Sequence, residues 1–117
     1  MAGTIHISDS LVWSAGTIAF ETSADVTRGR FTDSERDSVP EVYAPLDQGF
    51  GFIAIDELNL NAYRLFCRRC DEAYQECVER NNCPNVPQEF YEGVMECWRE
   101  FLDLMSKDDR FDSQQFP

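Results

Sequence analysis

Apolar and polar residues alternate along the first part of the chain, which is typical of β-strands. Ile5 and Ile7 alternate with polar neighbours, and the stretch LVWSAGTIAF (residues 11–20) is rich in β-branched and aromatic residues. The short segments EVYA (41–44) and GFGFIAI (49–55) have the same character, and the second is apolar on both faces, which favours a central or helix-covered strand. The pattern predicts that residues 1–55 are mainly β and form an antiparallel sheet of three to five strands.

The segment between these strands is polar. Residues 22–41, TSADVTRGRFTDSERDSVPE, contain Gly29 and Pro40, two residues that interrupt regular structure. We expect a long loop here, with room for one edge strand around residues 30–32. Loops of this length in a small domain are often functional.

After residue 55 the spacing of apolar residues changes from two to about 3.6, which predicts helices. Asp56 is expected to cap the first helix, which runs to about Arg80 and ends before the proline-containing loop NNCPNVP. A second helix is expected from about Gln88 to Ser106. The sequence therefore predicts a single α+β domain over residues 1–106, in which residues 56–106 form an antiparallel two-helix hairpin against the sheet, followed by a polar C-terminal tail at 107–117.

Three of the five cysteines lie in the segment CRRCDEAYQEC (67–77). At 100° per residue, Cys67, Cys70 and Cys77 share one stripe of the first predicted helix with apolar neighbours. Cysteine is among the residue types that are most often buried. We interpret this stripe as the inner face of the helix.

Two other interpretations of the cysteines remain open. Cys67 and Cys70 have the CxxC spacing of a zinc site, although a second closely spaced pair of ligands is missing from the sequence. A bridge between Cys67 and Cys97 would staple the helical hairpin. The nine residues between Cys67 and Cys77 resemble the first half of a twin CX9C hairpin, but thirteen residues separate Cys83 from Cys97. We expect no metal and no other cofactor.

The charge is strongly unbalanced, with 22 acidic against 10 basic residues and a net charge of −12. Such a surface repels nucleic acids and anionic membranes and attracts cationic partners. We therefore expect a basic protein partner and no direct binding to nucleic acid or membrane. The start of the chain, MAGTIHISDS, has no secretory pattern, and the longest apolar run is about half of what a membrane span requires. We expect a cytoplasmic protein.

Acidic residues form rows on the predicted helices. Neighbouring glutamates at i and i+4 repel each other, and here few basic residues are interleaved to relieve them. Such rows are either a solvated face or a functional surface, because carboxylates on a rigid helix resemble a phosphate backbone. The candidate contacts on the second helix are Glu89, Glu92, Glu96, Glu100 and Asp103; secondary candidates are Glu72, Glu76 and Glu79 on the first helix, and Asp33, Glu35 and Asp37 in the loop.

The sequence contains no common catalytic motif. It has no Gly-rich phosphate loop, GxSxG, HExxH or EF-hand pattern, and its lone histidine, His6, lies in a predicted strand. The acidic cluster Asp108, Asp109 and Asp112 lies in the tail, where a solubilising role explains it. We expect that the protein is not an enzyme.

These observations favour a small acidic inhibitor that occupies a cationic, nucleic-acid-handling surface of a partner enzyme. Two settings produce such proteins, namely phage anti-defence factors, such as anti-CRISPR or anti-restriction proteins, and immunity partners of toxins. Small size, strong acidity and missing catalytic groups resemble both classes. The alternatives are a structural subunit that dimerises or docks by apolar residues such as Phe50, Phe52 or Trp98, and a small zinc protein that uses Cys67 and Cys70.

Overall fold

The computed structural model describes residues 3–108 and 110, and this part of the chain contains three strands and four α-helices. The elements follow one another as β1 (Gly3–His6), β2 (Val12–Ala15), α1 (Thr17–Arg28), α2 (Ser38–Asp47), β3 (Phe52–Ala54), α3 (Leu60–Arg80) and α4 (Tyr91–Met105), with the short 3₁₀ turns η1 (Asp33–Glu35) before α2 and η2 (Gln88–Phe90) before α4. The fold is α+β, as predicted, and its sheet is N-terminal.

The sheet is mixed and has the strand order β2-β1-β3. β1 and β2 pair antiparallel, with Ile5 opposite Trp13, whereas β1 and β3 pair parallel, with Ile5 opposite Ile53. The prediction of an antiparallel sheet is therefore wrong for β3. A parallel pair needs a long crossover connection, which is usually helical, and here α1 and α2 supply it between β2 and β3.

The predicted strand at 11–20 is confirmed only over β2, because residues 17–28 form helix α1. The predicted strand EVYA (41–44) is wrong, because residues 38–47 form helix α2. In α1, Phe20, Ala24 and Thr27 are buried at helical spacing, so tertiary packing stabilises a segment of low helix propensity. In α2, Val42 and Tyr43 are buried, and the Tyr43 hydroxyl donates a hydrogen bond to the Ala24 carbonyl of α1 at 2.8 Å. The predicted loop 22–41 is therefore partly helical, and no strand forms at residues 30–32.

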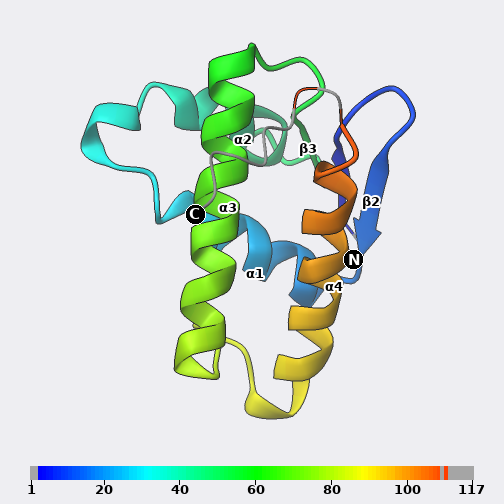
Figure 1. Ribbon diagram of the computed structural model, residues 1–117, viewed down its shortest axis with the longest axis vertical. Helices are drawn as coiled ribbons and strands as arrows, with labels where there is room; N and C mark the ends of the chain where they lie inside the picture. The colour runs from blue at the N-terminus through cyan, green and yellow to red at the C-terminus, as the bar shows by residue number, and fades with distance from the viewer. Residues whose placement is uncertain (1–2, 109, 111–117) are drawn as a thin grey trace.

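The two long helices lie close to their predicted positions. α3 ends at Arg80, after which Asn81 adopts the left-handed conformation that often closes a helix. Its N-cap is Asn59 and not Asp56, because the Asn59 side chain accepts a hydrogen bond from the Ala62 amide at 2.8 Å. Figure 1 shows α3 and α4 side by side, joined by the connection that contains η2.

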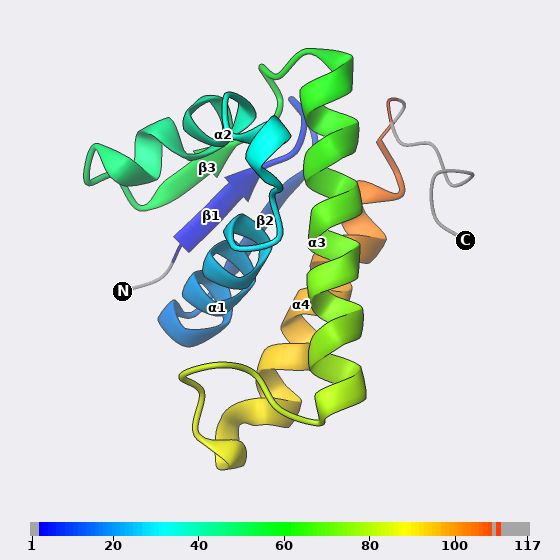
Figure 2. The same ribbon diagram turned by 90° about the vertical axis from the view of Figure 1, so that its left-hand side faces the viewer.

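Helix α1 lies between the sheet and the α3/α4 pair, whereas α2 packs beside β3 (Figure 2). One face of the sheet packs against the core. Its side chains there are Ile5, Trp13 and Ile53, which are nearly or fully buried. Trp13 also reaches α4, where its ring centroid lies 4.9 Å from that of Phe101. The core is therefore continuous from the sheet to the last helix.

The segment after α4 returns to the sheet. The Arg110 guanidinium donates hydrogen bonds to the carbonyls of Ile7 (2.6 Å) and Ile55 (3.0 Å) and stacks over the Tyr63 ring at 3.8 Å. Asp108 is buried and pairs with Arg110 at 3.0 Å, so its predicted solubilising role is wrong. Asp109, Asp112 and most of the predicted tail lie outside the described residues.

Candidate partner-binding surface

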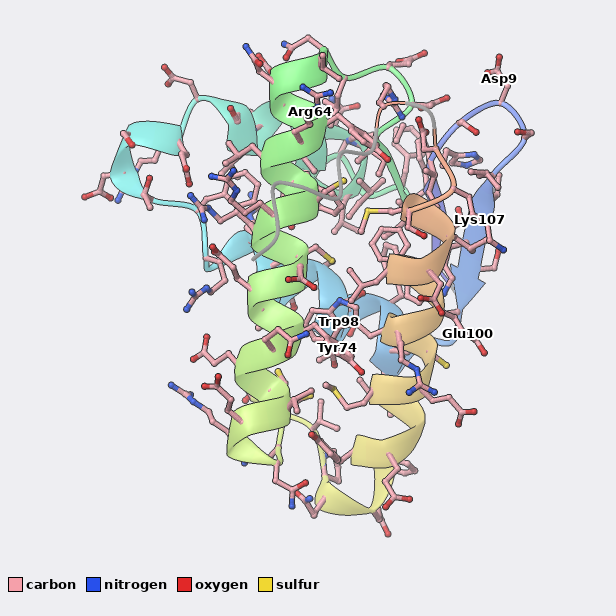
Figure 3. The ribbon with its side chains drawn as sticks, viewed as in Figure 1. Asp9, Arg64, Tyr74, Trp98, Glu100 and Lys107 are labelled. Atoms are coloured by element: carbon pink, nitrogen blue, oxygen red, sulfur yellow. The ribbon has the colours of Figure 1, made fainter. Side chains whose placement is uncertain are left out.

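The acidic residues of α4 and η2 form an exposed surface that we call the α4 acidic row. Its members are Glu89, Glu92, Glu96, Glu100 and Asp103, and all five are exposed. The opposite side of α4 is buried, with Val94, Trp98 and Met105 in the core. Figure 3 shows the exposed and buried sides of α4: Glu100 points away from α3, whereas Trp98 points towards Tyr74 of α3.

The α4 acidic row is not neutralised within the described part of the chain, since none of its carboxylates lies within ion-pair distance of a basic group there. Arg99, on the same helix, is exposed and likewise makes no ion pair among these residues. Glu92, Glu96 and Glu100 follow one another at intervals of four, which costs the helix a few tenths of a kcal/mol per like pair. The row therefore carries negative charge that is available to a partner.

The acidic residues of α3 have a different environment. Glu72 and Glu76 are partly buried and belong to a set of ion pairs, the α3 ion-pair network, whose members are Arg30, Glu35, Arg69, Glu72, Glu76 and Arg80. Arg30, two residues after the end of α1, lies 2.9 Å from Glu76 and 3.7 Å from Glu72. The expectation that both helices expose free acidic rows is therefore wrong for these two residues, although Glu79 is exposed.

Arg69 joins η1 to α3. Its guanidinium contacts both carboxylate oxygens of Glu35, at 2.9 and 2.6 Å, and one oxygen of Glu72 at 2.7 Å. These contacts hold the pKa of Glu35 at about 2, below its usual value of 4.5. Of the other loop candidates, Asp33 pairs with Arg36 at 2.9 Å, and Asp37 is exposed beside the start of α2. Glu35 thus orders the loop and presents little free charge.

We expect Glu35→Gln to lower the free energy of unfolding by about 1–2 kcal/mol at pH 7, because the bidentate charged contact with Arg69 is lost. A pKa that is lower in the folded than in the unfolded state stabilises the fold at high pH. The difference between wild type and variant should therefore be complete above about pH 4.5 and should shrink as the pH falls towards 2. Urea unfolding at pH 7 and pH 3.5 measures it, with Glu57→Gln as an exposed control. A difference that does not change with pH would contradict this role of Glu35.

All five cysteines are free thiols, so the Cys67 to Cys97 bridge is not formed. Cys67 and Cys70 are buried on α3, as the helical stripe predicted, where Cys67 contacts the sulfur of Met105 at 3.5 Å and Cys70 accepts the Trp98 indole N–H at 3.2 Å. Burial raises the pKa of both thiols to about 12, so they stay protonated at neutral pH. Protonated thiols in an apolar core are poor metal ligands and poor nucleophiles.

The residues considered for apolar docking differ in how far the structure exposes them. Trp98 is fully buried and cannot reach a partner, whereas Phe50 is 56% exposed. Phe52 lies between Phe50 and His6 on the outer face of the sheet, with ring centroids 5.9 and 5.6 Å away. His6 is therefore a packed strand residue, and among the described residues no group of three or more potential ligands is arranged to hold a metal ion. In the same part of the chain, no helix is long and apolar enough to cross a membrane.

No protein-family model matches the chain, and no curated protein matches its sequence. Among solved structures, the fold is similar to that of the immunity protein in the complex of the CdiA-CT toxin from Burkholderia pseudomallei E479 with its cognate CdiI immunity protein. The TM-score is 0.74 at 22% sequence identity, over 94% of this chain and 99% of that chain. This likeness shows that the two chains share a fold over nearly their whole lengths.

Proposed function

We propose that this chain is a non-enzymatic immunity protein that binds and neutralises a toxin in the cytoplasm. The similar fold occurs in an immunity protein that is bound to its toxin. Of the two settings that the sequence leaves open, this likeness supports toxin immunity over phage anti-defence. The exposed, unneutralised charge of the α4 acidic row is the observation that carries the proposal further, because it indicates the chemistry of the partner.

The partner that fits the α4 acidic row is a basic, nucleic-acid-handling enzyme. Glutamates four residues apart in the row are separated by about 6 Å along the helix axis, because each residue of an α-helix advances the chain by about 1.5 Å. A rigid line of carboxylates at this spacing imitates a run of phosphates and fits a cationic groove that normally binds nucleic acid. Opposite charges also accelerate association, which suits an inhibitor that must act before its target does damage.

The structure supports contact by the α4 acidic row more than by the α3 residues. Glu72 and Glu76 are already paired with arginines, so a partner would have to break existing ion pairs to use them. Glu79 and Asp37 remain accessible at the margins. We therefore place the centre of the contact on α4 and treat Glu35 and Asp33 as residues that order the neighbouring loop.

Affinity capture with the full chain as bait tests the proposal. From a lysate of cells that encode the chain, we expect a basic protein to bind at low salt and to elute as the ionic strength rises, because exposed charges are screened beyond about 10 Å at 0.1 M salt. That protein should arrest growth when it is expressed alone, and co-expression of this chain should restore growth. A captured protein that is not toxic, or whose binding does not respond to salt, would overturn the proposal.

A further inference from the structure

A second surface of the molecule has the shape and charge of a binding groove. It has a volume of about 510 Å³ and lies between α1 and the connection from α3 to α4. We call it the α1 groove; its lining includes Ile18, Glu21, Thr22, Asp25, Pro84 and Asn85. Ligand pockets in proteins commonly occupy about 300–1,000 Å³, so a side chain with its flanking backbone fits this volume.

The lining presents two carboxylates without a partner. Glu21 and Asp25 are exposed on one side of α1, four residues apart, and neither forms an ion pair within the described residues. Residues at this spacing have Cβ atoms about 5–6 Å apart, so one planar cation can bridge them. The cation that lines the groove, Arg30, is already engaged by Glu76 and Glu72 of the α3 ion-pair network.

The rest of the lining suits the stem of a long basic side chain. Ile18 is 42% exposed, and Pro84 faces the same space from the connection before α4. Thr22 is 8% exposed and contributes a hydroxyl-bearing side chain to the lining. An aliphatic stem packs on apolar surface while its charged head stays with polar groups, as long basic side chains commonly do.

We propose that the α1 groove binds an arginine side chain on an exposed segment of the protein partner. The guanidinium would lie between the carboxylates of Glu21 and Asp25 and donate a further hydrogen bond to the Thr22 hydroxyl. Arginine fits better than lysine because its planar fork donates in several directions to separate oxygens. The inference rests on the proposed function only in naming the partner as a protein with a basic surface.

Titration with the synthetic peptide acetyl-Gly-Arg-Gly-Arg-Gly-amide, followed by amide NMR shifts, tests the groove directly. We expect the largest shifts at Ile18, Thr22, Gly29 and Asn85, and at least a fivefold weaker response when citrulline, a neutral analogue of arginine, replaces both arginines. The double variant Glu21→Gln/Asp25→Asn should weaken binding of the arginine peptide at least fivefold.

The matched control removes the same charge elsewhere, in Glu92→Gln/Glu96→Gln, and should change the peptide affinity less than twofold. Equal weakening by both variants would show that net charge alone attracts the peptide, and shifts centred on α4 would place its site elsewhere; either result overturns the groove proposal. Because the peptide test requires no toxin, the groove can fail while the proposed function stands. Conversely, a loss of toxin neutralisation in the α4 variants says nothing about the groove.

Discussion

Replacing three members of the α4 acidic row by lysine, in the variant Glu92→Lys/Glu96→Lys/Glu100→Lys, is expected to weaken partner binding by about 100-fold or more. Close charge pairs across an interface contribute about 1.5–7 kcal/mol each when they are fully engaged, and exposed pairs contribute less. A loss of about 1 kcal/mol at each of three positions is about 3 kcal/mol, which corresponds to roughly two orders of magnitude in Kd. Titration calorimetry with the captured partner measures it.

The charge reversal should leave the fold intact. The three positions are exposed, and the variant exchanges like-charged glutamate pairs for like-charged lysine pairs. A lysine at position 96 repels Arg99 and a lysine at position 100 attracts Asp103, each by a few tenths of a kcal/mol, so the net change is small. Circular dichroism and urea unfolding should therefore give values close to wild type. A variant that has lost stability would not test the contact, so this measurement precedes the titration.

A second variant with the same change in net charge distinguishes a specific contact from general attraction. Asp9, Glu41 and Glu57 are exposed residues on the β1–β2 turn, on α2 and before α3. Their replacement by lysine should change partner affinity less than about threefold at 0.15 M salt, where charges farther away than about 8 Å are largely screened. If both triple variants lose binding equally, the partner responds to total charge, and the α4 acidic row is not its contact surface.

Trp98→Ala is expected to give the largest loss of stability, about 3–5 kcal/mol. Trp98 is fully buried between α3 and α4, its indole N–H bonds to Cys70, and its ring meets Tyr74 edge-on with centroids 5.7 Å apart. The substitution leaves a large cavity at the centre of the helix pair. Since small domains are stable by about 5–15 kcal/mol in total, the variant should unfold at a much lower urea concentration or at a much lower temperature.

Two further substitutions separate the causes of this loss. Trp98→Phe keeps most of the apolar volume but removes the N–H, so it should cost about 1–2 kcal/mol. Arg99→Ala, at the exposed neighbouring position, should stay within about 0.5 kcal/mol of wild type. A melting temperature of Trp98→Ala equal to that of wild type would contradict the central packing role of this residue.

The sequence was most informative where local periodicity and tertiary packing agree. α3 and α4 have wide apolar faces, and their ends are marked by Asn81 and by the prolines of the connection, so their positions were predictable. α1 was not predictable in this way, because its Thr and Ile residues favour strands by local preference. The α1 segment is helical because Phe20 and Ala24 then lie on one face, which packs against the sheet and the two long helices.

The same limit applies to the candidate surface. Helical periodicity alone places the five acidic residues of α4 on the exposed side. Glu76 pairs with Arg80 of the same helix at the local i,i+4 spacing, but it also pairs with Arg30, which lies 46 residues earlier in the chain and reaches α3 because α1 is a helix. The α1 groove depends on the same misassigned segment, since only helical geometry brings Glu21 and Asp25 close enough for one cation to bridge them.

The Arg110 guanidinium binds the carbonyl of Ile7, 103 positions earlier in the chain, so this contact can form only late in synthesis. During synthesis, the carbonyl of Ile7, the residue after β1, emerges early, but the guanidinium that binds it emerges when almost all of the described chain has been made. Contacts of such long sequence separation form late, because a large loop must close first. A nascent chain that stalls before residue 110 would therefore expose this end of the sheet to water and to other unfinished chains.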